Sequence, residues 1–280
     1  MCLIGLALNA HPRHAVVLAA NRDEFHDRPT AGLDWWRPAK GQVDVLAGRD
    51  LSAGGTWLGL GTQGRIGLLT NVRDPKRHRP DAPSRGALVA EWLASAGDAQ
   101  ALLPGWVRRG CNPFNLIGGD LATGQWWWGD DRSAAPQPLS DGVHALSNAS
   151  LDVPWPKVLR VRDALAAALG ISADAKALAA SLLDALSDRS VPPDGDLPDT
   201  GIGLARERAL APVFIHAAAS RYGTRSSTVL VGERTLANRW LLTVVERRYD
   251  ASGRPLEERM VQLAGWPGAA RAPVQVRPAY

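Results

Sequence analysis

The sequence predicts an α+β protein folded as a helix–sheet–sheet–helix sandwich. The first third alternates short apolar runs with glycine- and proline-containing turns, which is typical of a meander of antiparallel strands. Helical periodicity then appears in three segments, and strand-like runs lie between these segments and after them. Since sheets and helices each bury one apolar face, this order favours two stacked sheets with helices on their outer faces.

The length and composition fit one globular domain. The chain has 280 residues, of which 45% are hydrophobic and 21% are charged, and its net charge is +4. Such a chain can bury a sizeable core and does not have the composition of a disordered protein. No linker or internal repeat divides it, so we expect a single domain over residues 1–280, with residues 265–280 as an irregular C-terminal tail.

Two apolar runs open the chain and predict a β-hairpin. Cys2–Ala10 and Ala15–Ala20 are separated by the polar turn His11–His14. Glycine-rich turns and polar stretches separate the other candidate strands. These are Val43–Ala47, Thr56–Gly61, Arg65–Val72, Asn115–Asp120, Gln125–Gly129, Ser226–Gly232, Trp240–Tyr249 and Leu256–Leu263.

Three segments have helical periodicity. In Ser84–Ser95, apolar residues recur on one face and Ser84 can cap the N-terminus. The other two segments are Pro156–Leu169, whose leading proline suits a first turn, and Ala173–Ser187. The proline- and acid-rich stretch Asp188–Gly203 has no apolar period, so it is expected to be a long loop that either covers a site or is simply irregular.

Charge and hydropathy argue against nucleic-acid and membrane partners. Arginines are spread along the chain beside acidic residues, and the dense basic run Arg73–Arg79 is typical of a solvated loop, so we expect no nucleic-acid partner. No apolar run approaches the roughly 18 residues of a transmembrane segment. The run Leu3–Ala10 is too short for a signal sequence, and we therefore expect a cytoplasmic protein.

Cysteine and histidine spacings give no metal signal. Cys2 and Cys111 form no CxxC pair, and the six histidines show no HExxH spacing. We therefore expect neither a disulfide scaffold nor a metal site.

Cys2 directly follows the initiator methionine, which is generally removed before a small residue. Removal would give Cys2 a free α-amine with an ordinary pKa of about 7.7 to 8.0, able to accept the thiol proton near neutral pH. Thiol and amine together would form a nucleophile with its own base. On position alone, a buried strand cysteine or an S-acylation site is the preferred interpretation.

A compact polar run, Asn21–Glu24, follows the second predicted strand, where a hairpin would bring it beside Cys2. Arg22 could orient a thiolate or bind a substrate carboxylate, and Asp23 could hold the α-amine. The run is also typical of an exposed hairpin end. Because adjacent side chains on a strand point to opposite faces, Arg22 and Asp23 cannot both point at Cys2 without a bulge, and we favour Arg22.

Several short strings occur together in a specific order and spacing. They are Met1-Cys2, Asn21–Glu24, Gly54–Gly59, Leu69–Asn71, Phe114–Leu116, Leu146–Asn148, Pro154–Lys157 and Tyr222–Thr228. Together these strings resemble the NRDE family of the transport-and-Golgi-organisation type, from residue 1 to about residue 250.

The resemblance implies an N-terminal-nucleophile hydrolase fold, a four-layer αββα sandwich. It also implies a hydrolase that acts on a carbon–nitrogen amide bond of a small molecule and requires no cofactor. By analogy with cysteine-dependent acylases, the site residues are Cys2, Arg22, Asp23, Asn71, Asn148 and Arg225. Asn71 and Asn148 would help to form the oxyanion hole, although both are also typical strand-end turn formers.

The resemblance also implies an alternative, a non-catalytic protein that carries haem or an acyl-CoA-like lipid in the same cleft. One axial His, Cys, Met or Tyr would suffice for weak haem binding. Tryptophan is abundant, with eleven residues against three Phe and three Tyr, and some are expected to line a groove. On a strand, Trp126 and Trp128 would share one face and Trp127 would take the other.

Overall fold

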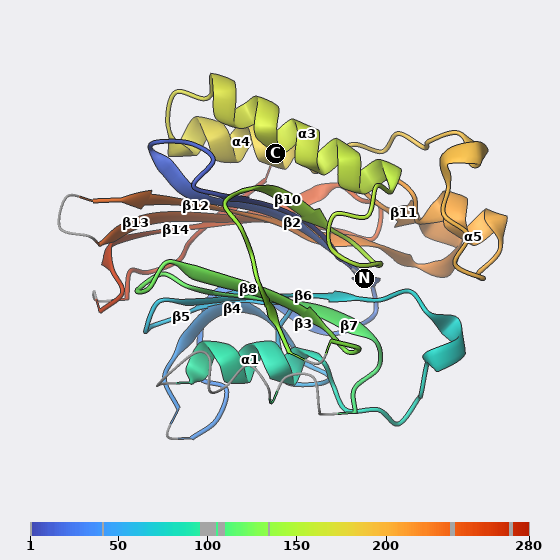
Figure 1. Cartoon of the computed structure of the whole chain (residues 1–280), viewed down its shortest axis with the longest axis horizontal. Coiled ribbons are helices and arrows are strands. Elements are labelled where there is room, and N and C mark those ends of the chain that lie inside the picture. Colours follow the sequence, from blue (N-terminus) through green and yellow to red (C-terminus); the bar gives the residue numbers. More distant parts are fainter. Residues whose placement is uncertain are drawn as a thin grey trace.

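Two antiparallel sheets lie face to face at the centre of the molecule, and helices cover the outer face of each (Figure 1). The computed structural model describes residues 2–40, 42–95, 105, 110–133, 135–235, 239–268 and 271–279. Three clusters of buried apolar side chains fill the spaces between the four layers. The predicted α+β fold, a four-layer αββα sandwich, is therefore confirmed.

The first sheet has eight strands and contains the N-terminal hairpin. Its order is β10-β1-β2-β12-β13-β14-β15, with β11 paired to β12. The strands are β1 (Cys2–Leu8), β2 (His14–Phe25), β10 (Gly142–Leu146), β11 (His216–Ala217), β12 (Tyr222–Arg234), β13 (Trp240–Tyr249), β14 (Pro255–Trp266) and β15 (Gln275–Pro278). The hairpin β1–β2 thus lies between β10 and β12, so both of its strands are paired on each side.

The second sheet has seven strands, and each strand pairs with the next one along the chain. They are β3 (Thr30–Trp36), β4 (Val45–Asp50), β5 (Leu58–Gly61), β6 (Arg65–Asn71), β7 (Phe114–Asp120), β8 (Gln125–Asp130) and β9 (Gln137–Pro138). This sequential order is the antiparallel meander that the glycine-rich turns predicted.

Helices from different parts of the chain cover the two outer faces. α1 (Gly86–Ala94) packs on the second sheet through the apolar face predicted from its sequence. α3 (Pro156–Ile171) and α4 (Ala175–Ala185) pack on the first sheet, and the short α5 (Leu204–Ala209) lies at one end of the sandwich (Figure 1). Within the described ranges, no helix is both long and apolar enough to cross a membrane.

β2 extends beyond its predicted end at Ala20 and includes the polar run Asn21–Glu24. The run is extended because β1 pairs with one side of the strand and β12 pairs with the other. Main-chain pairing of this kind satisfies the backbone whatever the polarity of the side chains. Asn21, Arg22 and Asp23 are therefore buried inside a sheet and Glu24 is half-buried, so the run is not an exposed hairpin end.

Some local features differ from expectation. α1 has Arg85 at its N-cap, so Ser84 does not cap the helix. β15 lies within the tail predicted to be irregular; it has no apolar period and forms by main-chain pairing with the edge of β14. β3 and α5 gave no clear periodic signal and were not predicted. Asp188–Gly203 is irregular apart from one short 3-10 turn, as expected.

The three consecutive tryptophans of β8 divide between two layers, as predicted from strand alternation. Trp126 and Trp128 pack in the core between the sheets, whereas Trp127 packs against α1. These three rings therefore pack in the apolar core of the protein and do not line a groove.

Candidate functional site

Side chains alternate along the N-terminal hairpin between the two faces of the first sheet. Even-numbered apolar residues of β1 such as Ile4 belong to the core between the sheets, whereas odd-numbered ones such as Leu3 pack against α3 and α4. Cys2 follows the even-numbered set and lies directly opposite Arg22 of β2. Because directly opposite residues share a face, the thiol and the guanidinium both point into the space between the sheets.

A cavity of about 320 Å³ lies beside Cys2. Its lining includes four of the six predicted site residues, which are Cys2, Arg22, Asp23 and Asn71. Cys2 is only 8% exposed, so the thiol is largely shielded from bulk water. The fold thus brings residues from β1, β2 and β6 to one hollow between the two sheets.

Arg22 is a buried cation with few direct partners. It is 5% exposed, and its guanidinium carbon lies 4.3 Å from the centre of the Trp57 ring. Its Nη2 lies 3.6 Å from Asp50 Oδ2 and 3.9 Å from Glu24 Oε2, longer than a hydrogen bond in both cases. Among the described residues, its Nη1 has no hydrogen-bond partner. A buried charged donor without a partner is costly, so a ligand oxygen could satisfy this nitrogen.

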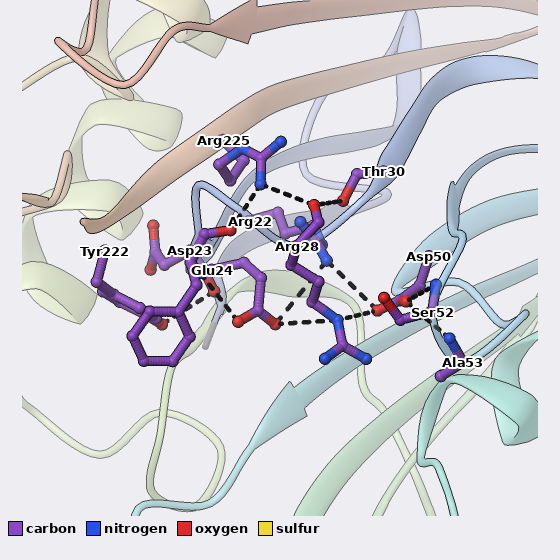
Figure 2. Close-up of polar contacts among 11 residues, drawn as sticks. Arg22, Asp23, Glu24, Arg28, Thr30, Asp50, Ser52, Ala53, Tyr222 and Arg225 are labelled. Carbon is purple, nitrogen blue, oxygen red and sulfur yellow. Dashed lines mark hydrogen bonds and ion pairs between the residues drawn. The ribbon is translucent and has the colours of Figure 1, made fainter. Parts of the chain in front are cut away.

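Arg28 binds the two carboxylates that lie near Arg22. Its Nε donates a hydrogen bond of 2.7 Å to Asp50 Oδ2 and lies 3.9 Å from Glu24 Oε2 (Figure 2). Burial acts to raise the pKa of Asp50, but the hydrogen bond from Arg28 and those from the backbone outweigh it and lower this pKa. Asp50 is therefore ionised at neutral pH and holds Arg28 at the cavity wall.

Asp23 lies on the opposite face of β2 from Arg22. Figure 2 shows the carboxylate of Asp23 directed away from the Arg22 guanidinium. Thr224 Oγ1 donates a hydrogen bond of 2.7 Å to Asp23 Oδ1. Burial raises the pKa of Asp23, and the cation of Lys157 opposes this shift. The nearby register shift adds a residue to β12, between Thr224 and Ser226, and leaves the alternation of side chains along β2 intact. Arg22 therefore shares the face of the Cys2 thiol and Asp23 does not.

The Cys2 thiol is protonated at neutral pH. Burial raises its pKa, and the negative charge of Asp23 adds to this effect while the positive charge of Arg22 opposes it. The thiolate is the nucleophilic form of cysteine. Catalysis by this thiol therefore needs a base that takes its proton during the attack.

The two predicted asparagines meet at the edge of the cavity. Asn71 ends β6, and its carbonyl oxygen accepts a hydrogen bond of 2.9 Å from Nδ2 of Asn148. Asn148 is buried and borders a neighbouring hollow, not the cavity beside Cys2. The preceding Ser147 donates through Oγ to the carbonyl oxygen of Cys2 at 3.3 Å. Since Nδ2 carries two hydrogens, the bond to Asn71 uses one of them.

Arg225 is not part of the cavity lining. Its Nη1 donates to the carbonyl oxygens of Phe25 at 2.7 Å and Arg28 at 3.1 Å (Figure 2). Arg225 therefore holds the segment that follows β2 and so helps to place Arg28. The structure gives it a supporting position behind Arg28, outside the lining of the cavity beside Cys2.

A second, larger cavity of about 790 Å³ adjoins the first. Four residues border both cavities, which are Glu24, Arg28, Asn71 and Arg85. His78 borders the second cavity and is a side chain of the type that ligates haem. Within the described part of the chain, no group of three His, Cys, Asp or Glu side chains is arranged to hold a metal ion.

Lys157, in the first turn of α3, is a buried cation that sequence reasoning did not single out. It is 3% exposed, and its Nζ donates a hydrogen bond of 3.0 Å to the carbonyl oxygen of Leu210. The buried ion pair between Arg73 and Glu207 borders the same small hollow. Burial and the nearby charge of Arg73 lower the pKa of Lys157 to about 8, although Asp23 opposes the shift.

The contribution of Lys157 to stability is expected to rise between pH 8 and 10.5, the pKa values of this group in the folded and unfolded chains. In this window Lys157 is protonated in the unfolded chain but not in the folded one, so its contribution to the free energy of unfolding increases with pH, by about 3 kcal/mol in total. The difference in free energy of unfolding between the wild type and Lys157→Met, obtained from urea unfolding at each pH, measures this rise. A difference that stays constant across the window would contradict the assignment.

The unpredicted residues at and near the cavity differ in the signal that the sequence gave. Trp57, on the cavity wall, and Lys157, in the neighbouring small hollow, stand inside short strings that resemble the family, so they were visible but had no assigned role. Arg28, Asp50 and Arg85 stand in no motif. They meet Cys2 only because the two sheets stack and α1 ends beside them.

The fold and the site together define a class of protein. Two sheets between helical layers, with a cysteine at the start of an inner strand and an arginine opposite it, form a four-layer sandwich with a cysteine-lined cavity between its sheets. The chain belongs to the Transport and Golgi organisation 2 family, whose profile matches residues 1–251. The family predicted from the sequence strings is thus confirmed.

Curated relatives cover most of the chain. The Transport and Golgi organization 2 homolog of Mus musculus is 32% identical, covering 90% of this chain and 97% of its own. The homolog of Bos taurus is 33% identical with the same coverage. Among solved structures, the Caenorhabditis elegans N-acylethanolamine-hydrolyzing acid amidase ortholog matches 82% of this chain and 92% of its own, with 16% identity and a TM-score of 0.43.

Proposed function

We propose that this protein is a cysteine N-terminal-nucleophile hydrolase that cleaves a carbon–nitrogen amide bond in a small molecule. The observation that carries the proposal is the position of Cys2 opposite Arg22 on the wall of a cavity between the two sheets. Once Met1 is removed, the α-amine of Cys2 is covalently next to the thiol. The cavity then contains a nucleophile, its base and a cation, and the reaction requires no cofactor.

The reaction would proceed through a thioester. The α-amine accepts the thiol proton, which the raised pKa otherwise keeps on sulfur, and the sulfur attacks the amide carbonyl carbon. The tetrahedral oxyanion collapses as the protonated α-amine donates its proton to the leaving amine. A water molecule then attacks the thioester, which releases the carboxylic acid and restores the thiol.

The role of each surrounding residue would depend on the face of the first sheet on which its side chain lies. Arg22 would stabilise negative charge on the thiol side, and Asp23 would hold the α-ammonium from the other side of β2. The side chain of Asn71, which lines the cavity, would donate to the oxyanion, where one donor contributes about 3 to 4 kcal/mol, and Asn148 would hold Asn71 in place through its hydrogen bond to the Asn71 carbonyl oxygen. Arg225 would act indirectly, through the segment that carries Arg28.

Removal of Met1 is the first expected result, and the intact mass of the natively expressed protein measures it. The processed protein should then react with iodoacetamide at Cys2 near pH 7 at least about tenfold faster than a variant with alanine inserted between Met1 and Cys2, because only the processed protein has the base beside the thiol. Cys111 is the internal control and should react equally in both proteins. Retained Met1, or equal rates at Cys2, would refute the proposal.

Binding of haem or an acyl-CoA-like lipid without turnover is the second candidate function. The larger cavity favours it, because aromatic residues Phe25 and Tyr222 border that cavity together with His78. Carriage needs no free amine at residue 2. The processed protein and the alanine-insertion variant would then bind haem or decanoyl-CoA equally, and neither would hydrolyse an amide.

A further inference from the structure

Two arginines on the walls of the adjoining cavities have no carboxylate partner among the described residues. Arg85, at the N-cap of α1, borders both cavities, and Arg206 of α5 borders the larger one. Arg85 Nη1 donates a hydrogen bond of 3.1 Å to the carbonyl oxygen of Pro113, which is a neutral partner. Arg28 differs, because Asp50 and Glu24 neutralise it.

Arg85 is a charged group that is partly removed from water. Burial lowers its pKa, which means that its surroundings disfavour the charged form. Buried charges in proteins are ordinarily paired, because an unpaired one loses its hydration without compensation. A carboxylate would supply the missing partner, since a guanidinium can bind it through two parallel hydrogen bonds.

The start of α1 adds to the positive potential of the same cavity. Ser84 and Gly86 line the cavity with Arg85, and the N-cap makes no side-chain hydrogen bond to the helix. A Cβ on Gly55 would lie 2.4 Å from the carbonyl carbon of Gly86, so a glycine is needed for the β4–β5 loop to pass this close. The N–H groups of Ala87 and Leu88 already donate to the carbonyl oxygens of Ser84 and Arg85, so the helix contributes the positive end of its dipole. The unpartnered Nη1 of Arg22 in the same cavity is an independent donor for an anion.

We infer that the substrate is an amide with a carboxylate close to the scissile carbonyl, and that Arg85, at the start of α1, binds this carboxylate. The inference rests on the proposed hydrolase function. Since Arg85 and Cys2 border one cavity of about 320 Å³, the carboxylate and the attacked carbonyl are only a few bonds apart. N-acyl amino acids have their carboxylate at this distance from the amide carbonyl. The positive charge of Arg206, on the wall of the larger cavity, would attract such an anionic substrate as it approaches.

Two alkylating reagents of nearly equal size test this charge preference at Cys2. Iodoacetate carries a carboxylate and iodoacetamide does not, so the ratio of their rates reports how strongly the cavity favours an anion. Arg85→Gln should lower this ratio about tenfold, the effect of losing one charge-assisted hydrogen bond. Arg277→Gln, on the exposed strand β15, is the matched control and should leave the ratio unchanged. The same ratio in wild type and Arg85→Gln would overturn the inference.

Binding without turnover separates this inference from the proposed function. Cys2→Ala cannot form a thioester, so calorimetric titration of this variant with N-octanoylglycine and N-octanoylethanolamine measures binding alone. The carboxylate ligand should bind at least about tenfold more tightly, and the added substitution Arg85→Gln should remove the difference.

Equal affinities of the two ligands, or no binding of either, would contradict the carboxylate subsite. If the preference is present but the wild type hydrolyses neither compound and Cys2 fails the alkylation test, the hydrolase proposal alone is wrong. Unfolding midpoints of the variants show whether Arg85→Gln keeps the fold, so that a loss of binding is assigned to the lost charge.

Discussion

Replacement of Cys2 by alanine is expected to lower kcat for any amide that the protein hydrolyses by about a thousandfold or more, since the variant lacks the atom that attacks the carbonyl. Hydrolysis of a panel of N-acyl aminocoumarins by the processed protein measures the loss. Cys111→Ala is the matched control, because Cys111 lies outside the lining of the cavity beside Cys2, and it should retain the wild-type rate.

The serine variant adds a second comparison at the same position. Cys2→Ser keeps the α-amine and a hydroxyl in place of the thiol, so it should bind substrate as the wild type does while turning it over far more slowly. Hydrolysis by Cys2→Ala at the wild-type rate would place the nucleophile elsewhere in the molecule and would end the case for a cysteine hydrolase.

Replacement of Glu207 by glutamine is expected to lower the free energy of unfolding by about 3 to 5 kcal/mol, the usual cost of breaking a buried ion pair by removing one charge. Glu207 Oε2 lies 2.5 Å from Arg73 Nη1, with side-chain exposures of 3% and 6%. Glutamine keeps the shape but not the charge. Arg73 is then left without its carboxylate, beside the second buried cation Lys157.

An exposed ion pair that also involves α5 provides the control for this measurement. Arg208 Nη2 lies 2.5 Å from Asp194 Oδ2, but these side chains are 48% and 49% exposed. Exposed pairs contribute about 1 kcal/mol or less, so Asp194→Asn should unfold almost as the wild type does in urea. Similar losses in both variants would mean that burial does not determine the strength of these pairs.

The strands could be predicted where apolar runs end at recognisable turns. The run Arg65–Val72 corresponds to β6, and Trp240–Tyr249 corresponds to β13 at both ends. The continuation of β2 through Asn21–Glu24 and the formation of β15 could not be predicted in this way. Both depend on main-chain hydrogen bonds to neighbouring strands, which the side-chain pattern of the segment itself does not record.

Only the part of the site that lies within the N-terminal hairpin could be predicted from the sequence. Cys2 and Arg22 belong to one hairpin with a visible turn, so their meeting follows from short-range pairing. Asp50, Arg85 and Lys157 come from separate elements in different layers. Their proximity to the site depends on how the two sheets stack and how the helices pack on them, and a single sequence contains no periodic signal for such contacts.

The length of the turn between β1 and β2 affects the chemistry of Cys2, because it determines which residue of β2 pairs with Cys2. Between Leu8 and His14 the chain reverses direction, and the number of residues there sets which side chain of β2 lies opposite Cys2. Removing one residue would slide β2 by one position and turn its side chains to the opposite faces. Asp23 would then share the face of the thiol in place of Arg22. Whether the number of residues in this turn is odd or even thus determines which charge lies beside the Cys2 thiolate, the cation of Arg22 or the carboxylate of Asp23.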